Sequence, residues 1–356
     1  MLNIQDKQLH FIVGIGRSGT TLLTNILNTH PDIHCEPEVN FLLFFLNHYN
    51  KQKGYSLEDI DLIFEEIKIY SLSHPTVGWI FDFDDAKKNI KNICQSNKDL
   101  SYIDLCKHIY CQFKIEGKDK SNSKIILDKN PGYTIQLKHI SQFSPQSKFI
   151  WLIRDYRANV LSRKQNAYLE TPSVAFNALR WRYFNYMALR FQIKNPSKVL
   201  LIKYEDLVCN EKIIIEKICI FLNAKSTQIL QGDLTTFKTK TTIPIFKDQE
   251  EYLTKKYTDL NKPINTSRVN SWKTELTKNE IILCETICGN FAEQFGYSRF
   301  QKKSFLKRIQ NIAPHFILLS NSIYNFMKDR ILYYESIQNK MKRLIAKHKS
   351  LNLIAK

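Results

Sequence analysis

The stretch VGIGRSGTT at residues 13–21 is the first in which residue types and spacing could do chemistry. Gly14 and Gly19 have the spacing of the phosphate-binding pattern G-x-x-x-x-G-K-[ST], and Thr21 stands at its Ser/Thr position. The lysine position holds Thr20 instead. Because that lysine normally reaches the β- and γ-phosphates, its replacement argues against ordinary ATP or GTP chemistry.

The same loop still offers many groups to an anion. Glycines allow a tight turn and a close backbone approach, and N–H groups at the start of a helix point at phosphate oxygens. Side chains add hydroxyl donors and one planar cation. We therefore expect an anion to be bound by Arg17, Ser18, Gly19, Thr20 and Thr21.

The surrounding elements must place this loop between a strand and a helix. An apolar run ends at the loop, and a stretch with helical spacing follows it until Pro31. Strands that alternate with helices predict an α/β fold with a central parallel sheet flanked by helices in three layers, the P-loop type. The runs that we read as buried strands are residues 9–15, 124–127, 148–153 and 198–203.

With these motifs in place, the chain resembles the PAPS-dependent sulfotransferases over about residues 9–300. GIGRSGTTLL followed by NTHPDIHCEPE is similar to the 5′-phosphosulfate loop of the tyrosylprotein and bacterial branch. WLIRDYRANVLS is similar to the 3′-phosphate motif, with Arg154 and Ser162. LDKNP, IKYEDLV and RVNSWKTELT are similar to three further segments of the family, which give Lys129, Tyr204 and Arg268.

The resemblance implies transfer of a sulfuryl group from PAPS, at a site that needs no metal. A hydroxyl or amine acceptor loses a proton as it attacks sulfur, so a carboxylate base is required. Glu36 and Glu38 are the candidates, and Glu38 is preferred because it matches the base of the tyrosylprotein branch. Lys129 would neutralise charge on the bridging oxygen; the alternatives are solvated acids and a surface lysine.

Arg154 and Ser162 would hold the 3′-phosphate that distinguishes PAPS from ordinary nucleotides. The alternative for Arg154 is an ion pair with Asp155 or another acid, and that for Tyr204 is a core aromatic. The family often has a basic residue four positions after the serine, where this chain has Asn166. Arg163 or Lys164 could substitute for it.

The chain of 356 residues carries a net charge of +18, concentrated in its C-terminal part. We expect a sulfotransferase domain over residues 1–300 with a helical insertion at 41–115 and loop-rich cover at 224–270. Residues 301–356 would form a basic amphipathic helical tail, in which Ile337 and Met341 belong to the apolar stripe. The tail could lie on an anionic membrane, dock on a partner or pack on the body.

No signal peptide or spanning segment is apparent, so we expect a cytoplasmic protein that could touch the inner face of a membrane. The acceptor would carry a hydroxyl group, with a glycan or lipid-linked saccharide favoured over a peptide tyrosine or small metabolite. Two other functions stay open at this point. One is a P-loop small-molecule kinase; the other is a non-enzymatic basic protein on membrane or nucleic acid, although no nucleic-acid motif accompanies the charge.

Overall fold

The computed structural model describes residues 3–73, 79–115, 117–165, 172–224, 266–300 and 335–354. Its centre is a five-stranded sheet in the order β2-β5-β1-β6-β7, in which every neighbouring pair is parallel. The strands are β1 (Gln8–Val13), β2 (Ile33–Cys35), β5 (Ile125–Lys129), β6 (Phe149–Ile153) and β7 (Val199–Lys203).

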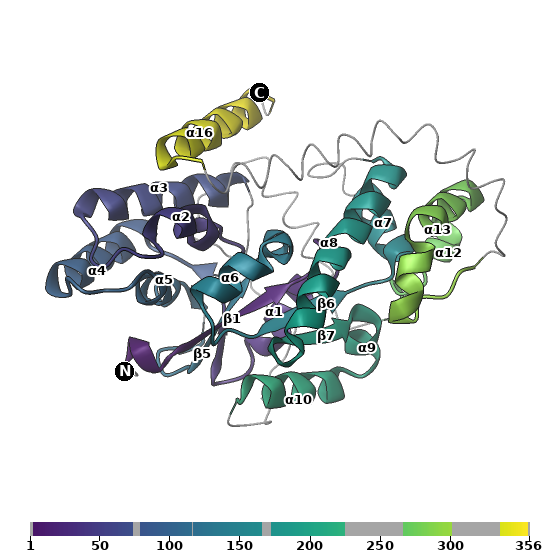
Figure 1. Ribbon diagram of the computed structural model, residues 1–356, viewed down its shortest axis with the longest axis horizontal. Helices are drawn as coiled ribbons and strands as arrows, with labels where there is room; N and C mark the ends of the chain where they lie inside the picture. Colours follow the sequence, from purple (N-terminus) through teal and green to yellow (C-terminus); the bar gives the residue numbers. More distant parts are fainter. Residues whose placement is uncertain are drawn as a thin grey trace.

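Both faces of this sheet are buried, which is why its strands are almost continuously apolar. On one face, Ile12 and Leu152 pack with apolar residues of helices α1 (Thr20–Leu27) and α10 (Glu211–Leu222). On the other face, Phe11 and Trp151 belong to a larger cluster formed with the insertion and with α8 (Val174–Lys194). Figure 1 shows the resulting layers, with the sheet between the two groups of helices. The predicted α/β architecture is confirmed.

The remaining described elements complete these layers. Short 3-10 helices are η1 (Ile4–Asp6), η2 (Pro131–Ile135), η3 (Pro196–Lys198) and η6 (Glu293–Phe295). The other helices outside the insertion are α6 (Leu137–Phe143), α7 (Tyr156–Lys164), α9 (Tyr204–Cys209), α12 (Trp272–Glu275), α13 (Lys278–Ala292) and α16 (Ile337–Ile354).

Residues 41–115 are largely helical, as expected. They cover one end of the sheet, on the face where Phe11 and Trp151 lie. The insertion also contains an antiparallel strand pair that the sequence did not predict. Its elements are α2 (Phe41–Tyr49), α3 (Leu57–Ser73), β3 (Trp79–Ile80), α4 (Phe83–Ser96), α5 (Tyr102–Tyr110) and β4 (Lys114–Ile115).

The C-terminal helix α16 lies along α3 (Figure 1). Met341 is buried, and the Lys340 ammonium donates a hydrogen bond to the backbone carbonyl of Phe44 at 2.8 Å. His48 of α2 contacts the Glu335 carbonyl at 3.0 Å. The first part of α16 therefore packs on the body, one of the three outcomes considered for the tail.

Some expectations fall on residues that are not described: most of the loop-rich cover, residues 225–265, and the first part of the tail, residues 301–334. The division into residues 1–300 and 301–356 stays a prediction. None of the helices within the described ranges is both long and apolar enough to span a membrane.

Candidate active site at the carboxyl edge of the sheet

The predicted site residues meet at the carboxyl edge of the sheet, where ligands bind in open α/β folds. Gly14 directly follows β1, Arg154 follows β6 and Tyr204 follows β7. Lys129 is the last residue of β5, and its register partner in β1 is Ile12. Glu36 follows β2 at the sheet's edge. Each of the five strands thus delivers one predicted residue to one edge.

The loop after β1 has backbone angles that require its glycines. Gly14 has φ +138°, and a Cβ there would lie 2.2 Å from the Leu152 carbonyl oxygen. Gly19 has φ +93°, and a Cβ there would lie 2.4 Å from the Tyr204 ring. Arg17 also adopts a positive φ of 69°. Gly19 begins α1 without a capping side-chain hydrogen bond, so among the described residues no cap competes with an anion for the first N–H groups of the helix.

Three residues support this loop, and the sequence had indicated only one of them, Arg163, as a candidate substitute for a basic residue at position 166. Thr134 accepts a hydrogen bond from the Gly14 N–H at 2.8 Å. Asn159 donates to the Gly16 carbonyl at 3.0 Å and to the Ser18 hydroxyl at 3.2 Å. Arg163 is fully buried and donates to the same carbonyl at 2.8 Å. Asn159 could have been found because it shares one face of the helix after Arg154 with Arg163, whereas no sequence pattern indicates Thr134.

Three arginines converge between this loop and β6. Arg154 donates to the Arg17 carbonyl at 3.2 Å and to the Arg268 carbonyl at 2.9 Å. Arg17 Nε lies 3.1 Å from Ser162 Oγ, which ties the 5′ and 3′ motifs together. Burial lowers the pKa of Arg154; Tyr204 and Glu205 oppose this effect, and the neighbouring Arg17 and Arg268 add to it. Such a concentration of positive charge favours an anionic ligand.

The alternative of an Arg154–Asp155 ion pair does not match the geometry. Asp155 pairs with Arg157 at 2.8 Å, while no carboxylate in the described part of the chain pairs with Arg154. The Arg154 Nε is buried and has no hydrogen-bond partner among those residues. Its guanidinium lies 4.4 Å from the centre of the Tyr204 ring. Tyr204 is itself 8% exposed, so it is both a core aromatic and a wall of the arginine cluster.

Glu38 and Lys129 form an ion pair of 3.1 Å beside the loop. The Lys129 side chain is 4% exposed, so it is not a surface lysine, whereas Glu38 is 27% exposed. Asn130 fixes the backbone next to Glu38 by donating to the Val39 carbonyl at 2.8 Å. This pair is therefore partly open to solvent and adjacent to the predicted anion site.

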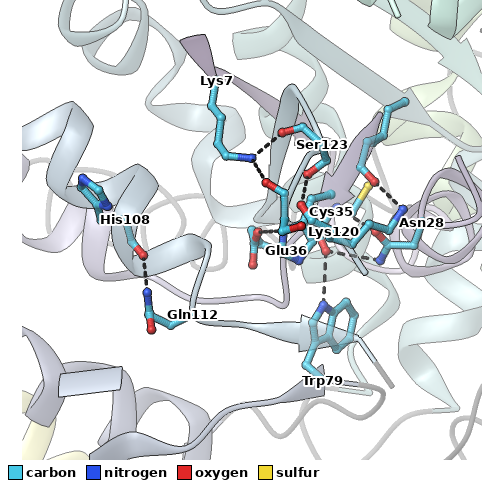
Figure 2. A network of polar contacts seen from close by, with 12 residues as sticks. Lys7, Asn28, Cys35, Glu36, Trp79, His108, Gln112, Lys120 and Ser123 are labelled. Carbon is cyan, nitrogen blue, oxygen red and sulfur yellow. Dashed lines mark hydrogen bonds and ion pairs between the residues drawn. The ribbon is translucent and has the colours of Figure 1, made fainter. Parts of the chain in front are cut away.

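Glu36 faces a different environment from Glu38. It is completely buried, 3.4 Å from His34, and burial followed by the nearby Asp128 raises its pKa well above the usual value. Figure 2 shows Glu36 within a network of polar contacts that also includes Lys7, Cys35 and Lys120. In that network, Lys120 donates to the backbone carbonyls of His30 and Ile33 at 2.6 and 2.8 Å.

Residues 266–276 are held at the site by contacts with α7. The Arg157 guanidinium stacks 3.8 Å from the centre of the Trp272 ring and pairs with Glu285 at 3.1 Å. This packing holds residues 266–276 against α7 and brings the exposed Arg268 to Arg154.

The candidate substitutes for a basic residue at Asn166 are both engaged elsewhere. Arg163 holds the loop carbonyl of Gly16, and Lys164 pairs with Glu280 at 2.6 Å. Asn166 itself lies outside the described residues. Among the residues that are described, no three His, Cys, Asp or Glu side chains are grouped so that they could hold a metal ion.

The fold defines a P-loop-type α/β protein, and its predicted anion site lies where a glycine loop and arginines meet at this edge. A family model described as "Sulfotransferase family" matches residues 10–228. The chain therefore belongs to the sulfotransferase family.

Two known proteins illustrate the similarity. A putative protein-tyrosine sulfotransferase of Caenorhabditis briggsae is 26% identical over 232 residues, which is 62% of this chain and 68% of the relative. The solved sulfotransferase domain of the Synechococcus PCC 7002 olefin synthase superposes with a TM-score of 0.50 at 20% identity, covering 82% of this chain and 96% of that one. The second similarity supports the fold alone.

Proposed function

We propose that this protein transfers a sulfuryl group from PAPS to a hydroxyl acceptor by in-line displacement. The observation that carries the proposal is the position of the Glu38–Lys129 ion pair, at 3.1 Å, beside a lysine-free phosphate loop in a sulfotransferase chain. Family membership removes the support for the kinase and for the non-enzymatic basic protein, because neither explains these residues together.

The donor would be held by two groups of residues. The free N–H groups at the start of α1, with Arg17 and the hydroxyls of Thr20 and Thr21, would bind the 5′-phosphosulfate. Arg154, Ser162 and Arg268 would hold the 3′-phosphate, and Tyr204 would bound the site.

The residues present fit such a donor. Buried Arg154 Nε has no partner within the described residues, and mutual repulsion of the three arginines would be relieved by a phosphate. A Cβ at Gly19 would clash with the Tyr204 ring. The position therefore requires glycine, whose bare backbone an anion can approach closely.

When bound, PAPS supplies an activated sulfuryl group. Glu38 takes the proton from the acceptor hydroxyl, and its partial exposure lets an acceptor reach it. Lys129, which donates one hydrogen bond to Glu38 at 3.1 Å, would neutralise the charge that develops on the bridging oxygen of the donor. The ion pair with Lys129 holds the Glu38 carboxylate in place beside the loop before the reaction.

For the acceptor we propose a glycan or lipid-linked saccharide. Peptide tyrosine is the second candidate, because the relative from C. briggsae is described as a protein-tyrosine sulfotransferase. The exposed basic side chains of α16, Lys342 and Arg343, would allow peripheral contact with an anionic membrane, at a cytoplasmic location.

The test compares Glu38→Gln with Glu36→Gln, using labelled PAPS with saccharide, with tyrosyl peptide and with water as acceptors. Glu38→Gln should lower turnover by about 10²–10⁴-fold while PAP affinity stays unchanged, since only the base is lost. Glu36→Gln should be much milder. An active Glu38→Gln protein would remove Glu38 as the base, and preference for the peptide would correct the acceptor.

A further inference from the structure

Residues 130–134 connect two parts of the candidate active site that lie far apart in the chain. They follow Lys129 at the end of β5 and form the N-cap and the first four residues of η2. The Asn130 N–H donates to the Ile12 carbonyl of β1 at 3.2 Å, which continues the strand pairing past Lys129. We call residues 130–134 the bridge segment, because its two ends contact different parts of the site.

The first end of the bridge segment holds the backbone beside Glu38. The Asn130 amide nitrogen donates to the carbonyl of Val39, the residue after Glu38, at 2.8 Å. The Asn130 amide oxygen accepts from the Gly132 N–H at 2.9 Å, so the side chain is held at both its nitrogen and its oxygen. Asn130 is 2% exposed, and breaking a hydrogen bond at such a buried group is costly. One side chain therefore fixes the chain beside the proposed base, directly after Lys129.

The other end of the bridge segment holds the phosphate loop. Thr134 Oγ1 accepts from the Gly14 N–H at 2.8 Å and donates to the Pro131 carbonyl at 2.8 Å. Because the hydroxyl uses both its proton and a lone pair, its direction is fixed. Thr134 is 1% exposed, so this contact is as buried as the one at Asn130. The bridge segment thus sets the position of the loop as well as that of the backbone beside Glu38.

The order of the strands explains why this segment can reach both parts. The proposed base follows β2, the phosphate loop follows β1, and β5 lies between these two strands in the sheet. The bridge segment follows β5, so it emerges between the base and the donor loop. In-line displacement depends on the distance between base and donor, and a displacement of about 1 Å can lower the rate on the order of 10²-fold.

We propose that Asn130 and Thr134 are positioning residues that hold the Glu38–Lys129 pair at a fixed distance from the phosphate loop. This inference rests on the proposed function. Each residue acts through another: Asn130 through the backbone beside Glu38, and Thr134 through Gly14. Loss of the Asn130 contact should therefore impair turnover alone, whereas loss of the Thr134 contact should also weaken donor binding.

The first experiment measures kcat and KM for PAPS with water as acceptor, PAP affinity by calorimetry, and melting temperature. Asn130→Ser keeps an oxygen that can cap η2, but its side chain is too short to reach the Val39 carbonyl. Its kcat should fall roughly 10–100-fold because the base is no longer held in place. Its PAP affinity should stay within about 2-fold, because the loop contact is intact.

Asn185→Ser is the matched control for a lost buried amide. Asn185 is also buried and also makes two hydrogen bonds, donating to the Trp181 carbonyl at 2.8 Å and accepting from the Trp151 indole at 3.1 Å. Its melting temperature should fall about as much as that of Asn130→Ser, while its kcat should stay within about 2-fold of the parent value.

Thr134→Val tests the other end of the bridge segment. Valine keeps the shape of threonine but leaves the Gly14 N–H without its acceptor, so the loop should lose its fixed position. PAP affinity should fall about 5–20-fold. Thr134→Ser retains the hydroxyl and should recover most of that affinity.

A double variant separates positioning from general destabilisation. If Asn130 acts through Glu38, adding Asn130→Ser to Glu38→Gln should slow turnover by no more than about 2-fold beyond Glu38→Gln alone. Losses that multiply would show that Asn130 acts independently of the base, and they would overturn the inference.

The outcomes distinguish this inference from the proposed function. If the parent protein turns over PAPS and Glu38→Gln is impaired, but Asn130→Ser is as active as Asn185→Ser, only the inference fails. It fails equally if Thr134→Val binds PAP as the parent does, or if Thr134→Ser recovers no affinity. A parent protein that neither binds PAP nor turns over PAPS would overturn the proposed function, and this inference with it.

Discussion

At the scale of single residues, the proposed role of Arg154 is to recognise the 3′-phosphate of the donor. Arg154→Ala should weaken PAP binding by about 1.5–3 kcal/mol, the value of a charge-assisted hydrogen bond. Adenosine 5′-phosphosulfate lacks the 3′-phosphate, so its binding should change little. Isothermal titration of both ligands gives the comparison, with Arg190→Ala on the exposed side of α8 as the control. Equal weakening of both ligands would show that Arg154 only shapes the loop.

Also at the scale of single residues, the titration of Glu66 tests whether the interior of the insertion is buried as the structure shows. It is fully buried in α3, neither carboxyl oxygen has a hydrogen-bond partner in the described part of the chain, and burial raises its pKa to about 8. A raised pKa means that the stability contributed by this group is complete below about pH 4.5 and is lost as the pH rises towards about 8.

Glu66→Gln removes that titration. Its stability relative to the parent protein should therefore rise between pH 5 and pH 8, by an amount on the order of a few kcal/mol, and level off above. Chemical unfolding at pH 5, 7 and 9 measures the difference, and the exposed neighbour Glu65→Gln serves as the control. A difference that is flat across this range would mean that Glu66 is not buried in its neutral form.

At the scale of elements, α16 docks on the insertion along α3, with a further contact to α2. Met341→Asp would place a charge where the side chain is 6% exposed, so α16 should detach. Hydrogen exchange in α16 and α3 should then accelerate at least ~10-fold, whereas exposed Lys342→Asp should leave both helices protected. Unchanged exchange in Met341→Asp would contradict the docked position.

The sequence predicted the main elements because their signals are strong and local. Apolar runs ending in glycine, lysine or arginine identified four of the five central strands. β2 was missed because it has only three residues and lies in the short segment between Pro31 and Pro37. The antiparallel pair β3–β4 was missed for the same reason, since two-residue strands have no readable periodicity.

At the scale of the whole molecule, the fold explains why residues far apart in the chain were predictable as one site. Every neighbouring strand pair is parallel, so residues at the ends of different strands meet at one edge. The supporting residues were not predictable in this way. Thr134 contacts Gly14 across 120 positions, and Asn159 contacts Ser18 across 141, distances at which sequence spacing carries no information.

The central claim is that this edge binds a nucleotide with both a 5′- and a 3′-phosphate, through a loop without the usual lysine. Calorimetric titration of the full chain with PAP, adenosine 5′-phosphate and ATP, with EDTA or with Mg²⁺, tests it most directly. PAP should bind equally well in both buffers and roughly 10–100-fold more tightly than adenosine 5′-phosphate, because the second phosphate meets the three arginines. Tight binding of ATP that requires Mg²⁺, with no preference for PAP, would contradict the account.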